Sequence, residues 1–372
     1  NETACNRKGK TSLRRSARRH PRPLQCINDE SPMIEVRIFT RWPSPRGSLP
    51  SRTIAACALA LAIMAQQPAR AAPSAFTIPM QVAELKAQDL RLAATIYRLA
   101  VANRRLCGNV MPATGLVLHG RDQYSAEVRA AAGASLQFET AVAVAGIVPD
   151  SPADDAGLRE NDSIVTISGI PVQPIAAQTG RTSAPRDQAE KLLASLPPTQ
   201  LIDIAYLRAG TRGAARLMPV AACRVRSEIL SGNAVAGQTD GDIMQFGDRV
   251  LKGLDAQGLA ALAAHELAHV ILEHRRRLEA MRVHTGLLGE FGSSRRTRRH
   301  AEIEADRLSV HLLTNAGMDP NLLLEFWQGP GRTIAPDLFR SRAYPSRKER
   351  MAIIESEILA RVANGAGPAA PD

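Results

Sequence analysis

The sequence predicts an α+β fold with three successive regions. Over residues 81–106, apolar side chains recur every three or four positions, which is the spacing of a helix that buries one face. From about residue 126 to residue 221, short alternating strands are separated by Gly and Pro, a pattern that predicts a compact module of strands. Residues 225–362 contain long Ala- and Leu-rich stretches of helical periodicity, so we expect a mostly helical domain.

The first region, residues 72–125, is an N-terminal helical segment, and both ends of the chain are expected to lie outside the folded domains. Its helix has the apolar positions Val82, Leu85, Leu92, Ile96 and Leu99. Residues 1–32 are rich in Arg and Pro, and Met33 is a candidate start that leaves them untranslated. Residues 363–372 consist mainly of Gly, Ala and Pro, and we expect them to form a disordered tail.

The charge of the chain is unevenly distributed. The 372 residues have a formal net charge of +11, and 45% of them are hydrophobic, a content that excludes a disordered chain. Residues 1–71 contain 13 basic and 4 acidic side chains, whereas the rest contain 34 and 32. Because the part after residue 71 is close to neutral, the sequence argues against a nucleic-acid partner.

Residues 1–71 have the features of a leader that ends in a signal peptide. Arg52 precedes the apolar run Thr53–Ala65, and Ala69-Arg70-Ala71 provides small residues at a cleavage site. This run is short for a bilayer span, and no later stretch is long and apolar enough to be one. We therefore expect cleavage near Ala71 and a periplasmic or secreted chain without a membrane-spanning segment.

Two cysteines, Cys107 and Cys223, remain after such cleavage. In an exported chain, two cysteines predict one disulfide, which here would bracket the strand module. The alternative is a pair of buried free thiols.

The strand module has an order of elements that points to a known family. Thr140–Val172 predicts a strand, a turn of helix closed by Gly157, and a second strand that ends at Gly169. The residues Val148–Ala153, Ala156-Gly157-Leu158 and Asn161–Ile164 resemble a PDZ domain of the bacterial protease-associated kind over about 126–221. Asn161 stands where that kind usually has Gly, and Asn tolerates the same positive φ.

The resemblance implies a groove in which a peptide C-terminus adds a strand to the module. The carboxylate-binding loop would be the segment Gly133, Ala134, Ser135, Leu136, Gln137 and Phe138. The alternative is a PDZ fold that serves only as a spacer.

A metal motif lies in the helical region. Asp255 is a candidate N-cap for a helix over residues 256–281, and His265 and His269 are four residues apart, so their rings share one helix face. Two neutral imidazoles suit Zn²⁺, and Glu266 lies beside them, where a carboxylate can take a proton from an activated water. A catalytic zinc needs a third protein ligand. Glu302 is the candidate, and Asp306, one turn later, would hydrogen-bond a ligand imidazole.

The sequence has the pattern His-Glu-x-x-His at 265–269, followed by Glu-x-x-Ala-Asp at 302–306. Together these two patterns are similar to those of the HtpX-like and CAAX-prenyl-endopeptidase-like zinc metallopeptidase family, over residues 225–360. The resemblance implies a zincin-type fold, one Zn²⁺ per chain, Glu302 as third ligand and Glu266 as general base. It also implies an edge strand that aligns substrate, at Asn233, Ala234, Val235 and Ala236.

One position departs from the family pattern. Where the family usually has His-Pro-Ser, this chain has Tyr344-Pro345-Ser346. A phenol binds zinc poorly but can donate a hydrogen bond to a developing oxyanion, so Tyr344 is a candidate oxyanion donor. The alternative is a catalytically quiet binding or chaperone protein that retains the zinc fold.

The sequence therefore predicts an exported zinc endopeptidase, and the resemblance implies that it acts on unfolded or misassembled envelope proteins. Its strand module would bind peptide C-termini. The Gly- and Ser-containing segment 284–296 is either a lid over the cleft or a plain connector. His274, His284, His300 and His311 are expected on solvated or packed faces. The arginine runs at 275–277 and 295–299 are expected at solvated helix ends, with binding of acidic substrate or lipid headgroups as the alternative.

Overall fold

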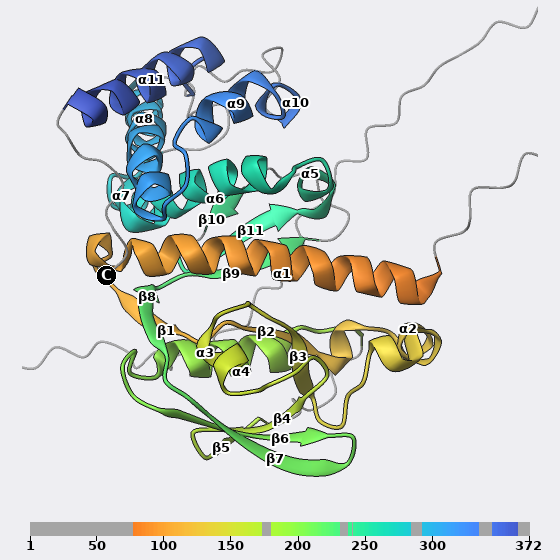
Figure 1. The fold of residues 1–372 in the computed structure, drawn as a ribbon. Helices are drawn as coiled ribbons and strands as arrows, with labels where there is room; N and C mark the ends of the chain where they lie inside the picture. Colours follow the sequence, from red (N-terminus) through yellow and green to blue (C-terminus); the bar gives the residue numbers. More distant parts are fainter. Residues whose placement is uncertain are drawn as a thin grey trace, which may run out of the picture. The chain divides into compact units, whose positions relative to one another are not determined.

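The fold was analysed in a computed structural model that describes residues 77–172, 180–230, 237–239, 241–283, 292–334 and 344–363 (Figure 1). Every described residue belongs to one compact unit, Ala71–Asp372. This unit has a mixed α and β fold, in agreement with the predicted class. The predicted leader and signal peptide, the edge strand 233–236 and all but the first residue of the predicted tail lie outside the described residues.

Helix α1 (Ile78–Ala102) contacts both the strand module and the helical region. Proline in its first turn suits a helix start, where the backbone N–H has no intrahelical partner. Its predicted apolar positions Leu92, Ile96 and Leu99 are buried. Arg91 donates hydrogen bonds to the carbonyls of Leu251 and Leu254. These bonds join α1 to the segment just before helix α6 (Ala256–Ile271).

A six-stranded sheet forms the strand module, with helix α4 (Ala184–Ser195) packed against it. The main path of the sheet has the order β2-β3-β4-β6-β7, with β5 paired to β4, and all pairs are antiparallel. The bounds are β2 Leu116–Gly120, β3 Val142–Ile147, β4 Ser163–Ile167, β5 Ile170–Pro171, β6 Ile202–Arg208 and β7 Thr211–Leu217. Strand β2 precedes the range 126–221 that the sequence predicted for this module, so the sheet extends further upstream than expected.

The turns of this module follow the predicted chemistry. Helix α3 (Pro152–Asp155) is a single turn, and Gly157 after it has φ +70°. Asn161 has φ 69°, which confirms the positive φ predicted for it. The next residue, Asp162, is fully buried and accepts two hydrogen bonds from the Arg208 guanidinium, at 2.6 and 2.7 Å.

A short antiparallel ribbon connects the module to the rest of the chain. It pairs β1 (Val110–Ala113) with β8 (Val220–Cys223). Cys107 and Cys223 are joined in a disulfide beside this ribbon, which is the pairing that the sequence predicted. The bond ties the end of α1 to the start of the helical region.

The helical region combines a three-stranded sheet with the helices that carry the metal motif. The sheet has the order β10-β11-β9, with β9 and β11 parallel, and its strands are β9 Arg226–Leu230, β10 Gln238–Thr239 and β11 Ile243–Gly247. The helices are α5 Asp248–Lys252, α6 Ala256–Ile271, α7 His274–Ala280, α8 Gly292–Asn315, α9 Leu322–Gln328, α10 Gly331–Ile334 and α11 Arg347–Ala363. Helix α6 contacts α1, α8 and α9, so the helix that carries His265 and His269 lies in the core.

The segment 256–281, which was expected to form one helix, forms two. The prediction of a single helix is wrong, because α6 ends at Ile271 and α7 begins at His274. Between them Glu273 adopts a left-handed conformation, with φ 50°, which breaks the helical path. No helix among the described residues is long and apolar enough to cross a membrane.

Candidate metal centre

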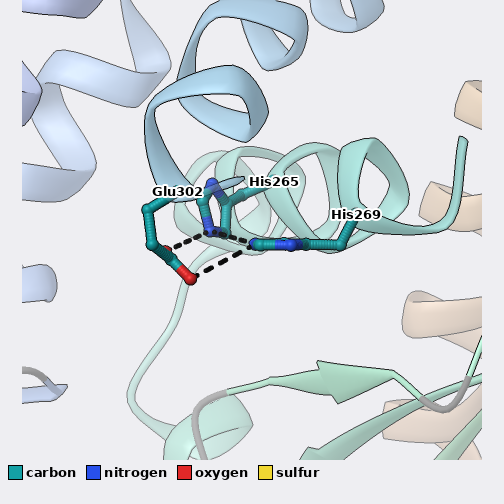
Figure 2. A group of neighbouring side chains, drawn as sticks. All are labelled: His265, His269 and Glu302. Carbon is teal, nitrogen blue, oxygen red and sulfur yellow. Dashed lines mark hydrogen bonds and ion pairs between the residues drawn. The ribbon is translucent and has the colours of Figure 1, made fainter. Parts of the chain in front are cut away.

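Three side chains from two helices meet at the candidate metal centre (Figure 2). Helix α6 supplies His265 and His269, and helix α8 supplies Glu302. The Nε2 atoms of His265 and His269 are 3.1 Å apart. The Glu302 carboxylate lies 3.4 Å from His265 Nε2 and 3.7 Å from His269 Nε2. The sequence predicted these residues as ligands, and the fold brings all three together.

The separations fit a tetrahedral zinc ion. Zinc bonds to N and O of about 2.0–2.2 Å place two ligand atoms of a tetrahedron about 3.3–3.5 Å apart. The observed spacings bracket this value, and the ligand atoms of the three residues all lie within 4.8 Å of one another. The donor set of two imidazoles and one carboxylate is also the set found in catalytic zinc sites, which keep a fourth position open.

Burial and charge prepare two of these groups for a cation. Burial lowers the pKa of His269 to about 3, which keeps the imidazole neutral. Burial acts to raise the pKa of Glu302, but the hydrogen bond from His265 and the charge of Arg350 hold it well below its usual range. A neutral imidazole and an ionised carboxylate are the forms that bind metal.

His265 differs, because its environment favours a proton. Burial and the Arg350 charge act to lower its pKa, but hydrogen bonds to Asp306 and Glu302 outweigh them and raise it to about 9. Asp306 Oδ1 lies 3.3 Å from His265 Nδ1, the supporting contact that the sequence predicted for this residue. A metal that binds His265 must displace this proton, so metal affinity depends on pH.

Arg350, on α11, supports this side of the site and was missed by the sequence analysis. Its guanidinium donates to both oxygens of Asp306, at 2.8 and 2.6 Å, and it lies 4.1 Å from the ring centroid of Trp327. Asp306 and Arg350 are both buried. Charge pairing and stacking therefore hold Asp306 against His265 from behind. Local spacing gave no signal for Arg350, since it lies far along the chain from both helices.

Glu266 is buried beside the metal ligands, with 8% of its surface exposed. Burial, reinforced by the Glu302 charge, raises its pKa to about 7 despite the opposing charges of His265 and Arg350. A carboxylate with such a pKa is suited to take and return protons near neutral pH. A β-carbon built on Gly237 would stand 2.6 Å from Glu266 Oε1, so glycine at this position leaves room for the carboxylate.

A cavity of about 560 Å³ opens onto these groups. Gly237, Gln238 and Thr239, at the start of β10, form one side. The other lining residues include an apolar group, Leu262, Leu323, Phe326, Trp327 and Ile334. A strand edge on one side and apolar side chains on the other suit an extended peptide.

Tyr344 lines the same cavity and is 38% exposed. Arg298 donates a hydrogen bond of 2.7 Å to its hydroxyl oxygen. Because the oxygen accepts from Arg298, the hydroxyl hydrogen is available for donation into the cavity.

The segment Gly133–Phe138 packs into a small core. Gly133–Ser135 form a 3₁₀ turn after α2 (Ala126–Ala132), Leu136 packs with Val82 of α1, and the Phe138 ring lies 4.5 Å from that of His119. The segment does not line the cavity beside β2, and its role as a carboxylate-binding loop stays a prediction.

Strand β2 forms one edge of the six-stranded sheet. A second cavity, of about 160 Å³, is lined by β2, by the residues before it, by α4 and by α1. Ionic side chains from two regions meet there: Arg186 on α4 contacts Glu228 on β9 at 3.0 Å, and Glu190 lies 3.5 Å from Arg226. Gln245 donates a hydrogen bond to Glu228, and Gln238 donates one to Gln245. Gln238 lines the larger cavity, beside the candidate metal ligands.

The other predicted positions are solvated or paired. His300 contacts Glu304, and His311 contacts Glu357. Arg275 and Arg276 are exposed and pair with glutamates of their own helical turn. The part of 284–296 that the structure describes, from residue 292, begins α8, whereas His284 and its neighbours lie outside the described residues.

Comparisons with known proteins give little. No protein-family model matches this chain, and no curated protein matches it. Among solved structures, it is similar to a serine endoprotease from Yersinia pestis (17% identity, TM-score 0.21), covering 30% of this chain and 29% of that one. It is also similar to the HtrA-type protease AlgW with a decapeptide (23% identity, TM-score 0.23), covering 30% of each chain.

A third similar structure is the HtrA3 PDZ domain bound to a phage-derived ligand, FGRWV, with 12% identity and a TM-score of 0.22. The match covers 30% of this chain and 88% of that one.

Proposed function

We propose that this chain is a zinc-dependent endopeptidase. The observation that carries the proposal is the meeting of His265, His269 and Glu302 at zinc-ligand spacing, with the buried carboxylate of Glu266 beside them. Two imidazoles, one carboxylate and an adjacent base are the parts of a hydrolytic zinc site.

In the proposed mechanism His265, His269 and Glu302 would hold a zinc ion, which would supply Lewis-acid chemistry and lower the pKa of a water in the site toward about 7. Glu266 takes the proton from that water as it attacks the scissile carbonyl, and then gives it to the leaving amine. Its raised pKa suits both transfers. The Tyr344 hydroxyl donates a hydrogen bond to the oxygen that becomes negative.

The proposed substrate is an extended segment of an unfolded or misassembled envelope protein. It would lie along Gly237–Thr239 as an added strand, with side chains against the apolar lining of the cavity. We further propose that the strand module is a PDZ domain that binds peptide C-termini at the β2 edge, next to α4. The periplasmic or secreted location stays a prediction from the leader.

The test is a comparison of the purified chain with Glu266→Gln. We expect one equivalent of zinc in both proteins, and casein cleavage by the wild type only, because the amide cannot accept the proton. Zinc at one equivalent without cleavage would support the alternative of a catalytically quiet binding or chaperone protein. Equal cleavage by both proteins would exclude Glu266 as the base.

A further inference from the structure

The two candidate ligand imidazoles have different partners on their second nitrogen. His265 Nδ1 faces the carboxylate of Asp306, the usual kind of partner for a metal-binding histidine. His269 Nδ1 instead lies 2.8 Å from Nδ1 of a third histidine, His274. His274 is 3% exposed, although it is the first residue of α7.

The other nitrogen of His274 faces a carboxylate. His274 Nε2 lies 3.1 Å from Glu304 Oε2, and the same oxygen accepts a hydrogen bond from Arg277 at 3.1 Å. Glu304 is on α8, two positions after Glu302, so one helix provides both a metal ligand and the last member of this contact chain. The left-handed conformation of Glu273 separates α6 from α7 just before His274. The centroid of the His274 ring lies 4.8 Å from that of His269.

When a metal occupies Nε2 of His269, only one arrangement of protons satisfies all of these contacts. His269 faces Glu302 with Nε2, so a metal bound there requires the hydrogen on Nδ1. That hydrogen is donated to His274 Nδ1, which must then be unprotonated. The hydrogen of His274 therefore lies on Nε2, where Glu304 accepts it. Glu304 thus determines which nitrogen of His274 accepts, and His274 determines which nitrogen of His269 is left for the metal.

We propose that His274 and Glu304 are positioning residues that fix the tautomer and ring orientation of the metal ligand His269. This inference rests on the proposed zinc site. The two residues do not touch substrate in this role. They act through His269, and their effect is on metal binding first and on hydrolysis only as a consequence.

The experiment measures zinc affinity by competition with a chromophoric chelator, and the absorption spectrum of the Co²⁺-loaded protein. The variants are His274→Leu, His274→Gln and Glu304→Leu, together with the His274→Leu/Glu304→Leu double variant. His311→Leu and Glu357→Leu are matched controls, because His311 and Glu357 form the same kind of pair, at 2.9 Å, on α8 and α11. His311 lies about 13 Å along the helix from Glu302, at 1.5 Å rise per residue.

We expect His274→Leu to weaken zinc binding by about 10- to 100-fold and to change the Co²⁺ spectrum, since losses of this size follow removal of such partners. A glutamine can accept from His269 and donate to Glu304, so His274→Gln should retain most of the affinity. Glu304→Leu should weaken binding in the wild type but not in the His274→Leu background, because Glu304 acts through His274. The controls should bind zinc as the wild type does.

Equal losses in His274→Leu and His274→Gln would overturn the inference, as would additive losses in the double variant or wild-type affinity in both His274 variants. Circular dichroism of the metal-free proteins identifies any variant that does not fold. In that case, the partly exposed Glu304 and the conservative His274→Gln carry the test. A wild-type protein that binds no zinc would instead refute the proposed function.

Discussion

Gly237 and Glu266 are packed so closely that a larger residue at position 237 would require the Glu266 side chain to move. A β-carbon there would meet Oε1, Cγ and Cδ of Glu266 at 2.6–2.8 Å. The first residue of the cavity's strand edge therefore determines where the proposed general base lies. The backbone proposed to align a peptide is therefore packed against the carboxylate proposed as the general base.

Substitution of Gly237 by Ala should therefore reduce turnover while zinc stays bound. The added methyl group displaces the Glu266 carboxylate, and a displacement of about 1 Å at a reacting group costs up to about 100-fold in rate. The measurement is kcat and KM for a peptide substrate, together with zinc content. Gly108→Ala is the control, because a β-carbon at Gly108 has nothing within 4 Å. Unchanged kcat in Gly237→Ala would contradict the contact.

Removal of the Arg350 guanidinium should destabilise the metal-free protein. Arg350→Met leaves the buried Asp306 carboxylate without its bidentate partner, and breaking a buried pair in this way costs about 3–5 kcal/mol. Urea denaturation measures the loss. Arg307→Met is the control, because Arg307 is exposed and 3.8 Å from its partner Glu357, and such pairs contribute about 1 kcal/mol or less. Equal stability of Arg350→Met and wild type would show that Asp306 does not need this partner.

The stability of the chain should depend on the ionisation of Glu190. Burial raises the pKa of Glu190 to about 7, outweighing the charges of Arg186 and Arg226. Between its ordinary value of 4.5 and about 7 the folded chain holds a proton that the unfolded chain releases, so Glu190 makes the free energy of unfolding fall as pH rises.

Glu190→Gln remains neutral and removes this contribution. The stability of the variant relative to wild type should therefore increase from about pH 5 to about pH 8, as measured by urea denaturation at a series of pH values. A difference that is constant over this range would show that Glu190 is charged in the folded chain at all of these pH values.

Reduction of the disulfide should lower the free energy of unfolding. Cys107 and Cys223 are 116 positions apart, and the chain-entropy model gives about 4–5 kcal/mol for a loop of this length. The measurement is urea denaturation with and without a reductant. The Cys107→Ser/Cys223→Ser variant should have the stability of the reduced protein and no response to the reductant. A response in this variant would point to an effect unrelated to the bond.

The sequence predicted those parts of the site that depend on local periodicity. His265 and His269 share a helix face because they are four residues apart, and Glu302 and Asp306 follow the same rule on α8. Asp255 as N-cap of α6 is likewise a local property, and its side chain accepts a hydrogen bond from the Gly258 N–H at 2.7 Å.

Residues that reach the site through tertiary packing were not predictable in this way. Arg350 comes from α11, and its pairing with Asp306 depends on how α11 packs against α8. His274 was missed as a partner of His269 for a different reason. A continuous helix was expected across residues 272–273, and only the left-handed Glu273 places the ring behind its neighbour.

The sequence did not indicate that β2 would be an edge strand, because the pattern of strands alone does not give the order of strands in a sheet. β2 pairs with β3 and stands at the end of the order of strands, which makes it an edge strand. The segment 133–138, between β2 and β3 in the sequence, contains apolar side chains that pack against α1. Pairing between strands distant in sequence depends on the whole fold.

The chain of contacts from Arg186 through Glu228 and Gln245 to Gln238 has a thermodynamic consequence for both cavities. Arg186 lines the smaller cavity and Gln238 lines the larger one, so the two cavities are connected through Glu228 and Gln245. If an occupant of the smaller cavity changes the affinity of the larger cavity for a peptide, linkage requires the peptide to change the affinity of the smaller cavity by the same factor.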